Sequence, residues 1–390
     1  MSNYSQTSYI DADNDAMQSD DEQTNQSPTE FFNDAISALK AAAPEGSTVR
    51  AIGFDRTDNF LRAGYRVVEG DADVTIARGG EREFDLARKI DCRKLILAPT
   101  HAYAAVATER YRTTDGKFAV MKHGAMPYAA VFDETDVDGN LASVFAETAM
   151  LDLAAFDVTF GTIMRGERVD ARLTSDVAAL VTELTAALKN SEKDRAACVK
   201  TLVRVGEKSA RIVSDHPELL HASGAAQTAE ALRMLYVAED RPLGMRGETE
   251  MVLGAYIIDF YIKNLAAQSI EFPPDNNKRI DRVCEYFNTD IRRACVYATA
   301  IYPPIKMRLY EYRRNEFRAE QMRLLAELKN RHAAAWQVFK RLYPDDGYSL
   351  KSLVDKTDIG ICLALAPDVF NADTMLSFLK QTGRLEKYIV

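Results

Sequence analysis

The segment Val74-Thr-Ile-Ala-Arg-Gly-Gly-Glu-Arg-Glu-Phe-Asp-Leu-Ala-Arg88 is the best starting point for interpreting the chain. It begins with a short apolar run, passes through two adjacent glycines and ends with the spacing of an amphipathic helix. Folds with a parallel sheet bind phosphates at such turns, because glycine lets backbone N–H groups approach the anion. A glycine pair is by itself weak evidence, since tight turns also use one. The order of strand, turn and helix predicts an α/β domain of the nucleotide-binding kind.

The residues around this segment alternate between short strands and helices. Strands are predicted at 48–54, 65–68, 73–77, 94–98 and 128–132, helices at 30–43 and 83–90, a short helix or turn at 58–64, and a hairpin in 110–131 around Asp115-Gly116. This alternation is typical of a parallel sheet. The run with Asp133, Asp136 and Asp138 is interpreted as a polar loop that follows the last strand.

The pattern changes after Leu141, where apolar residues recur every three or four positions and predict helices only. Helices are predicted at 142–164, 175–188, 194–215, 225–238, 248–268, 281–287, 290–299, 305–342, 349–354 and 372–381. The fold class is therefore a Rossmann-like α/β domain with a parallel sheet over residues 29–140, followed by an all-α helical domain over residues 141–390. Ligands commonly bind in the cleft between two such domains.

Composition excludes several classes of protein. Hydrophobic residues make up 47% of the 390 positions and the formal net charge is −9. No nucleic-acid partner is expected, because no surplus of Lys and Arg exists to replace phosphate counterions. No membrane partner is expected, because no run reaches the ~18 apolar residues of a transmembrane helix. The five scattered cysteines, without a CxxC pair, favour reduced thiols and a cytoplasmic location.

Residues 1–28 form an acidic leader, and no Lys or Arg precedes Lys40. A segment so poor in apolar residues cannot offset its ordering entropy, so it is predicted to be disordered. A solvated leader without a fixed role and a docking segment for a partner both remain open.

Four segments, taken in chain order, resemble a known superfamily. They are Val74–Arg88, Leu97-Ala-Pro-Thr-His101, Ala149-Met-Leu-Asp-Leu-Ala-Ala-Phe156, and the pair Ser223-Gly-Ala-Ala-Gln227 with Leu243-Gly-Met-Arg-Gly-Glu248. The superfamily contains the iron-containing alcohol dehydrogenases, glycerol dehydrogenase, glycerol-1-phosphate dehydrogenase and 3-dehydroquinate synthase. The resemblance covers residues 45–390, implies a dehydroquinate synthase-like fold, and is greatest to glycerol-1-phosphate dehydrogenase in the helical part.

The resemblance implies that the glycine turn binds the pyrophosphate of NAD or NADP. It assigns cofactor binding to Gly79, Gly80, Asp85, Pro99 and Thr100. Glu81 stands where the family has a third glycine, and its carboxylate is electrostatically adverse to a pyrophosphate. His101 is either an acid–base group or a structural loop histidine.

The resemblance also implies a metal site in the helical part, and this chain has replaced most of it. The family's Asp is Asp152, but Gln227 and Arg246 stand where its two histidines would be. An amide is a poor metal ligand and a guanidinium has no lone pair to offer, so no metal is assigned, except through Asp152 if one is retained. The predicted alternative is an ion pair between Asp152 and Arg246, with Gln227 beside it. His216 and His221 are the imidazoles from which a rearranged site could be built.

Three functions remain open. The resemblance implies an NAD(P)-dependent oxidoreductase acting on a small polyol or polyol phosphate, with catalytic residues Asp152, Arg246 and Gln227. The alternative is a catalytically degenerate relative, a pseudoenzyme that binds a small ligand in the interdomain cleft or a protein partner. A lyase or synthase on the same scaffold is a third reading, and the family's assemblies make a homo-oligomer an expectation.

Overall fold

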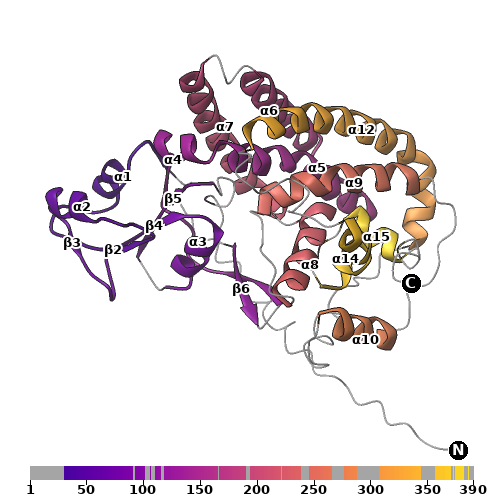
Figure 1. Cartoon of the computed structure of the whole chain (residues 1–390), viewed down its shortest axis with the longest axis horizontal. Coiled ribbons are helices and arrows are strands. Elements are labelled where there is room, and N and C mark those ends of the chain that lie inside the picture. The colour runs from indigo at the N-terminus through magenta and orange to yellow at the C-terminus, as the bar shows by residue number, and fades with distance from the viewer. Residues whose placement is uncertain are drawn as a thin grey trace, which may run out of the picture.

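The computed structural model describes a defined part of the chain. The described residues are 30–90, 93–101, 106, 110–115, 118–165, 167–189, 194–220, 222–238, 246–265, 276–287, 307–343, 356–369, 372, 374–381 and 385. The acidic leader at 1–28 and the helices predicted at 290–299 and 349–354 lie outside them. Figure 1 shows strands gathered at the indigo end of the colour scale and helices over the rest.

The strands form one parallel sheet, as predicted. In spatial order they are β1 (Glu30–Phe32), β8 (Ala129–Val131), β5 (Lys94–Pro99), β4 (Val74–Gly79), β2 (Thr48–Ile52) and β3 (Arg66–Val67). Helices α1 (Ala35–Ala42), α2 (Asp58–Arg62) and α3 (Glu81–Arg88) connect them. The predicted hairpin is also confirmed, since β6 (Arg110–Asp115) pairs with β7 (Phe118–His123) antiparallel. Residues 30–131 are called the sheet half below.

The start of the sheet half corrects one prediction. Residues 30–32 are a strand and not the first turn of a helix, because Glu30 and Phe31 pair in register with Ala129 and Ala130 of β8. The helix begins only at Ala35, where Asp34 is the N-cap and accepts a hydrogen bond from the Ser37 backbone N–H at 2.8 Å. Pairing with a strand distant in sequence therefore outweighs the local helical spacing.

Helices make up the described chain from Leu141 onward, and they are called the helical half below. They are α5 (Leu141–Arg165), α6 (Leu173–Leu188), α7 (Arg195–Asp215), the 3₁₀ turn η3 (Pro217–Leu220), α8 (Gly224–Ala238), α9 (Arg246–Asn264), α10 (Asn276–Phe287), α12 (Met307–Leu342), α14 (Lys356–Val369) and α15 (Met375–Gln381). α5 is buried along most of its length and packs against α6, α9 and α12. The fold class is confirmed, while the domain limits 29–140 and 141–390 stay a prediction.

Two helices in this layout were not predicted. The polar run after β8 is a short helix, α4 (Glu134–Gly139), and not a loop; Asp133 caps it by accepting the Thr135 backbone N–H at 2.7 Å. α14 escaped prediction because it is buried on nearly all sides and contains Pro367, so no amphipathic spacing marks it. None of the described helices combines the length and the apolar character that crossing a bilayer requires.

Candidate functional site

The glycine turn lies at the carboxyl ends of two neighbouring strands. The register of β4 and β5 places Gly79 opposite Pro99, and the Thr100 backbone N–H donates to the Gly79 carbonyl at 2.8 Å. Gly80 follows as the N-cap of α3. Gly79, Gly80, Pro99 and Thr100 therefore lie together at the carboxyl edge of the sheet, while their assignment to cofactor binding stays a prediction.

The backbone donor of this turn already has an acceptor within the chain. The Gly80 N–H donates to Glu83 Oε2 at 3.0 Å, which is the position that an anion takes at a helix N-terminus. Gly79 has φ of 147°, and a Cβ there would lie 2.5 Å from the same carboxylate oxygen. The two glycines therefore accommodate Glu83, whose carboxylate accepts the Gly80 N–H.

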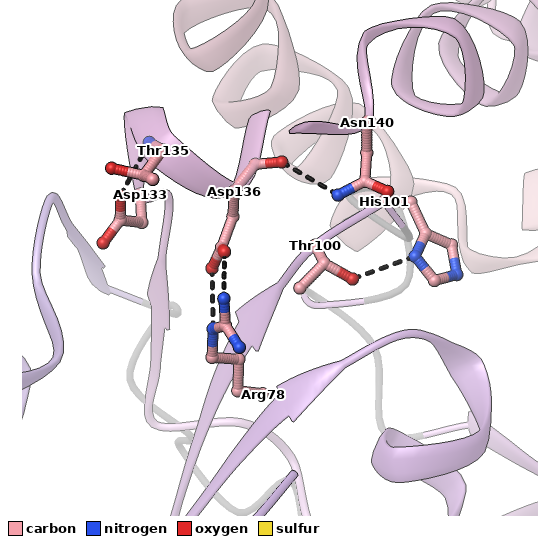
Figure 2. Close-up of polar contacts among 7 residues, drawn as sticks. All are labelled: Arg78, Thr100, His101, Asp133, Thr135, Asp136 and Asn140. Atoms are coloured by element: carbon pink, nitrogen blue, oxygen red, sulfur yellow. Dashed lines mark hydrogen bonds and ion pairs between the residues drawn. The ribbon is translucent and has the colours of Figure 1, made fainter. Parts of the chain in front are cut away.

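His101 covers the other side of the turn. A Cβ on Gly80 would lie 2.2 Å from His101 Nε2, so the ring packs directly on the glycine. Figure 2 shows the contact that orients the ring, between Thr100 Oγ1 and His101 Nδ1 at 2.9 Å. Burial lowers the pKa of His101, opposed by the charges of Glu81 and Glu83. The imidazole fills space through which a dinucleotide phosphate would approach Gly80.

Asp85 lies on the next turn of α3 and is half-buried. It faces the charge of Arg88, which is almost fully buried on the same helix and lies 6.0 Å from the Phe84 ring centroid. Burial lowers the pKa of Arg88 to about 10, opposed by the charges of Asp85 and Glu81. Asp85 therefore acts here through Arg88, and its assignment to cofactor binding stays a prediction.

Glu81 and Arg246 form an ion pair that joins α3 to α9. Arg246 Nη1 lies 2.7 Å from Glu81 Oε1, and Arg246 Nε lies 2.5 Å from Glu250 Oε1. The guanidinium also donates to the Leu220 carbonyl of η3. Burial would lower the pKa of Arg246, but the carboxylates of Glu81 and Glu250 outweigh it and raise that pKa above its ordinary value. Arg246 is therefore a fixed cation.

A cavity of about 20 Å³ lies behind this ion pair, with room for at least one water molecule. Its lining residues are Glu81, Glu147, Met150, Leu151, Ala154, Leu219, Leu220, Arg246, Gly247 and Glu250. Four of these residues, Glu147, Met150, Leu151 and Ala154, come from α5. Counted from Glu147 they lie three, four and seven positions on, so they share one face of that helix. Among the described residues that line the cavity, Glu81 is the one from the sheet half, and the others belong to the helical half.

Asp152 forms an ion pair with a different arginine from the predicted Arg246. Its carboxylate is 5% exposed and pairs with Arg331 of α12, through Nε–Oδ2 at 2.6 Å and Nη2–Oδ1 at 2.9 Å. Burial raises the pKa of Asp152, opposed by Arg331. The predicted Asp152–Arg246 pair is wrong, because Asp152 follows Leu151 on α5 and so points away from the cavity face on which Arg246 lies.

Gln227 is fully buried, and its amide contacts neither Asp152 nor Arg246 but residues at the start of α15. Its Oε1 accepts the Thr374 hydroxyl at 2.6 Å, and its Nε2 donates to Ser377 Oγ at 3.0 Å and to the Ala372 carbonyl at 3.3 Å. The amide thus ties α8 to the start of α15. The three residues predicted to form one site, Asp152, Gln227 and Arg246, are instead bonded to α12, α15 and α3.

The imidazoles do not provide a replacement metal site in the described chain. His216 lies 3.4 Å from Asp170 and 3.6 Å from Glu218, while His221 lies outside the described residues. Among the residues that the structure describes, no group of three or more His, Cys, Asp and Glu side chains could hold a metal ion.

Several residues of the site were missed from the sequence. Glu250 stands four positions after Arg246 on a helix, a spacing that signals an ion pair. Glu83 stands three positions after the N-cap, which is the spacing of a capping box. Arg331 and Glu147 carry no comparable local signal, because their partners depend on how distant helices pack.

The comparisons with known proteins find similarity in structure and not in sequence. No protein-family model matches the chain, and no curated protein matches it. Among solved structures, a 1,3-propanediol oxidoreductase matches with a TM-score of 0.53 and 12% identity, over 93% of this chain and 96% of that one. The chain has the fold of the iron-containing alcohol dehydrogenases.

Two further matches agree with this fold. An iron-containing alcohol dehydrogenase from Corynebacterium glutamicum has a TM-score of 0.50 at 11% identity, over 91% of this chain and 94% of that one. A maleylacetate reductase from Rhizobium has a TM-score of 0.50 at 14% identity, over 91% and 95%. Identities this low establish the iron-containing alcohol dehydrogenase fold and carry no activity with them, so the function rests on the site.

Proposed function

We propose that this protein is a catalytically degenerate relative of the dehydrogenases that share its fold, and that it binds a small ligand or a protein partner without metal-dependent hydride transfer. The observation that carries the proposal is the Glu81–Arg246 ion pair. One partner stands at the third glycine of the cofactor turn, and the other stands at a metal-ligand position of the resemblance. A single contact therefore changes both functional positions together.

The side chains at the metal-ligand positions do not fit a transition metal. Asp152 already accepts two hydrogen bonds from Arg331, and both ends of the Gln227 amide are bonded within the core. Arg246 has no lone pair to donate and a raised pKa. Zinc and iron in catalytic sites require imidazole or carboxylate ligands, so this donor set supports a site that works without a metal.

The cofactor turn fits a pyrophosphate no better. The Gly80 N–H is bonded to Glu83, the imidazole of His101 lies over Gly80, and Glu81 adds a second carboxylate on the first turn of α3. Two like unit charges 4 Å apart near a protein surface repel each other by about 4 kcal/mol. Binding a dinucleotide would require these side chains to move first.

The proposed ligand site is the cavity between Glu81 and the helical half. It combines the cation Arg246 with the carboxylates Glu147 and Glu250, and one wall consists of the apolar side chains Met150 and Leu151. A small polar molecule that reaches this cavity would meet both signs of charge.

A second candidate is an NAD(P)-dependent oxidoreductase acting on a small polyol or polyol phosphate, such as glycerol 1-phosphate. The order of β4, Gly79-Gly80 and α3, with Thr100 directly after the adjacent strand β5, favours this candidate. It requires His101 and Glu83 to leave the turn when the cofactor enters.

Titration with NADH and NADPH, followed by nicotinamide fluorescence and calorimetry, separates the two candidates. The degenerate reading predicts no saturable binding at millimolar cofactor, and no stoichiometric zinc or iron by elemental analysis after expression in metal-supplemented medium. Saturable submillimolar binding, or one tightly held metal ion per chain, would instead support the oxidoreductase.

A pair of variants tests whether Glu81 prevents the glycine turn from binding NADH. Glu81→Gly restores the third glycine, and Arg82→Gly is its matched control, because it places the same residue at the adjacent exposed position without removing the carboxylate. We expect tighter NADH binding from Glu81→Gly alone. Equal affinities in both variants would show that Glu81 does not obstruct the turn.

A further inference from the structure

The described chain passes once between the two halves, and α4 is the crossing point. On one side, Asp136 accepts two hydrogen bonds from Arg78 at the end of β4, one of them from Nε at 3.0 Å (Figure 2). On the other side, Asp138 Oδ1 accepts from Arg195 Nε at 2.5 Å, and the Asp138 carbonyl accepts from Nη2 at 2.8 Å. This six-residue helix is therefore bonded to the sheet half and to α7 of the helical half.

A second connection lies at α3. This helix packs on β4, β5 and β6, so it belongs to the sheet half, whereas α9 packs on α5, α8 and α12 in the helical core. The Glu81–Arg246 ion pair joins these two helices. In Figure 1, α4 and α3 both lie between the indigo strands and the remaining helices, at different heights along the junction.

Both partners of this ion pair have alternative interactions. Arg246 keeps Glu250 on its own helix and the Leu220 carbonyl if Glu81 withdraws. Glu81 lies in the first turn of α3, where the helix dipole stabilises a carboxylate. Their side chains are 22% and 25% exposed, so both are largely buried, and the guanidinium depends on its remaining Glu250 partner when Glu81 withdraws. The pair can thus break and reform between two stable arrangements.

We propose that α4 is a hinge and that the Glu81–Arg246 ion pair is a latch. When the latch breaks, the sheet half rotates about α4 and the cavity behind Arg246 widens. When it forms, the Glu81 side chain lies along the cavity and narrows it. This inference goes beyond the proposed function, because the motion does not depend on which ligand the cavity binds.

The test uses a graded series at Glu81 with a matched control in the helical half. Glu81→Gln removes the charge at constant size, and Glu81→Lys places a cation against Arg246. Glu183→Gln is the control, because Glu183 forms ion pairs with Arg204 and Lys208 that join α6 to α7 within one half. Small-angle X-ray scattering measures the radius of gyration, and hydrogen exchange measures protection of η3 and the first turn of α9.

If the latch exists, the radius of gyration and the hydrogen-exchange rate of η3 and the first turn of α9 should both increase from wild type to Glu81→Gln to Glu81→Lys. The exchange rate should rise roughly threefold or more along the series. Glu183→Gln should match wild type. High salt should move wild type toward Glu81→Gln and leave that variant nearly unchanged, because screening weakens a partly exposed pair.

Two outcomes would overturn the proposal. One is an unchanged radius and unchanged exchange in Glu81→Lys, and the other is an equal response in Glu183→Gln. If circular dichroism shows that Glu81→Lys is unfolded, the effect of high salt on wild type and on Glu81→Gln still tests the proposal. Without a latch, the two proteins should respond to salt equally.

Discussion

Asp152 of α5 and Arg331 of α12 face each other in a two-point ion pair, with N–O distances of 2.6 and 2.9 Å. The carboxylate is 5% exposed, so it depends on this guanidinium. We expect Arg331→Met to lower the free energy of unfolding by about 3–5 kcal/mol, because it leaves a buried charge without its partner. Asp152→Asn should cost less, about 1–3 kcal/mol, since it leaves only an unfavourably placed amide. Urea denaturation measures both.

Metal content provides the control for this pair. If Asp152 acts only through Arg331, Asp152→Asn leaves the zinc and iron content of the purified protein unchanged. A loss of bound metal in this variant would contradict the ion-pair role and return Asp152 to a ligand role.

Gly80 is expected to be intolerant of a side chain because of His101. A Cβ at this position would lie 2.2 Å from the imidazole, so Gly80→Ala should destabilise the protein by about 1–2 kcal/mol. The same change in a His101→Ala background should cost much less, since the ring is then absent. Thermal and urea unfolding of the four proteins gives the coupling. Equal costs in both backgrounds would mean that the glycine is required by its backbone and not by the histidine.

Asp157 should make the stability of the fold depend on pH. Its carboxylate is fully buried on α5 and accepts the backbone N–H groups of Gly224 and Met375, both at 2.8 Å, and the Tyr261 hydroxyl at 3.1 Å. Burial raises its pKa from 3.8 to about 7, against the lowering effect of these donors. The folded state therefore holds this proton more tightly than the unfolded chain does.

The sign of the pH effect follows from that difference. The stabilisation from protonated Asp157 is fully present below pH 3.8 and is lost as the pH rises through about 7. The buried His101 and His332 have lowered pKa values and act in the opposite sense below their unfolded value of 6.5. Asp152, Glu248 and Glu250 also have raised pKa values and act in the same sense as Asp157. The contribution of Asp157 is therefore measured as the difference between wild type and Asp157→Asn in urea denaturation across pH 5 to 8. The free energy of unfolding should fall more, or rise less, with increasing pH in wild type than in the variant, and equal pH profiles would disprove the assignment.

Lys380 and Asp368 form a fully buried pair between α15 and α14, with 3.2 Å between Nζ and Oδ2. Lys380 also donates to the Ala364 carbonyl at 3.0 Å. Lys380→Met alone should cost about 3–5 kcal/mol, because the Asp368 carboxylate loses its cation inside the core. The double variant Lys380→Met/Asp368→Leu should recover most of that cost. If the double variant is as unstable as the single one, the amine contributes through its packing and not through its charge.

The sheet half was largely predictable because its signals are local. Val74–Arg88 contains its own strand, glycines and amphipathic helix, and the structure forms them at β4 and α3. Phe31 was misassigned because its helical spacing is also local, whereas its pairing with Ala130 is not. The helix α14 was missed for a different reason, since a segment buried on nearly all sides shows no periodicity.

The partners of the site residues could not be predicted from the sequence. Gly79 and Pro99 each follow a predicted strand, and the structure pairs them because neighbouring parallel strands end at one edge of the sheet. It identified Glu81 and Arg246 as two separate departures from a family pattern, without joining them. Which carboxylate a guanidinium selects depends on the packing of helices far apart in the chain. Asp152 was paired with the wrong arginine for that reason.

The Glu81–Arg246 contact has an evolutionary consequence. Replacing Glu81 by glycine alone removes one anion beside a largely buried cation, and replacing Arg246 by histidine alone leaves the carboxylates of Glu81 and Glu250 facing each other. Each of these single substitutions is therefore expected to lower the stability of the protein on its own. The identities of residues 81 and 246 are consequently expected to change together, because either change made first leaves charges of one sign without their partner.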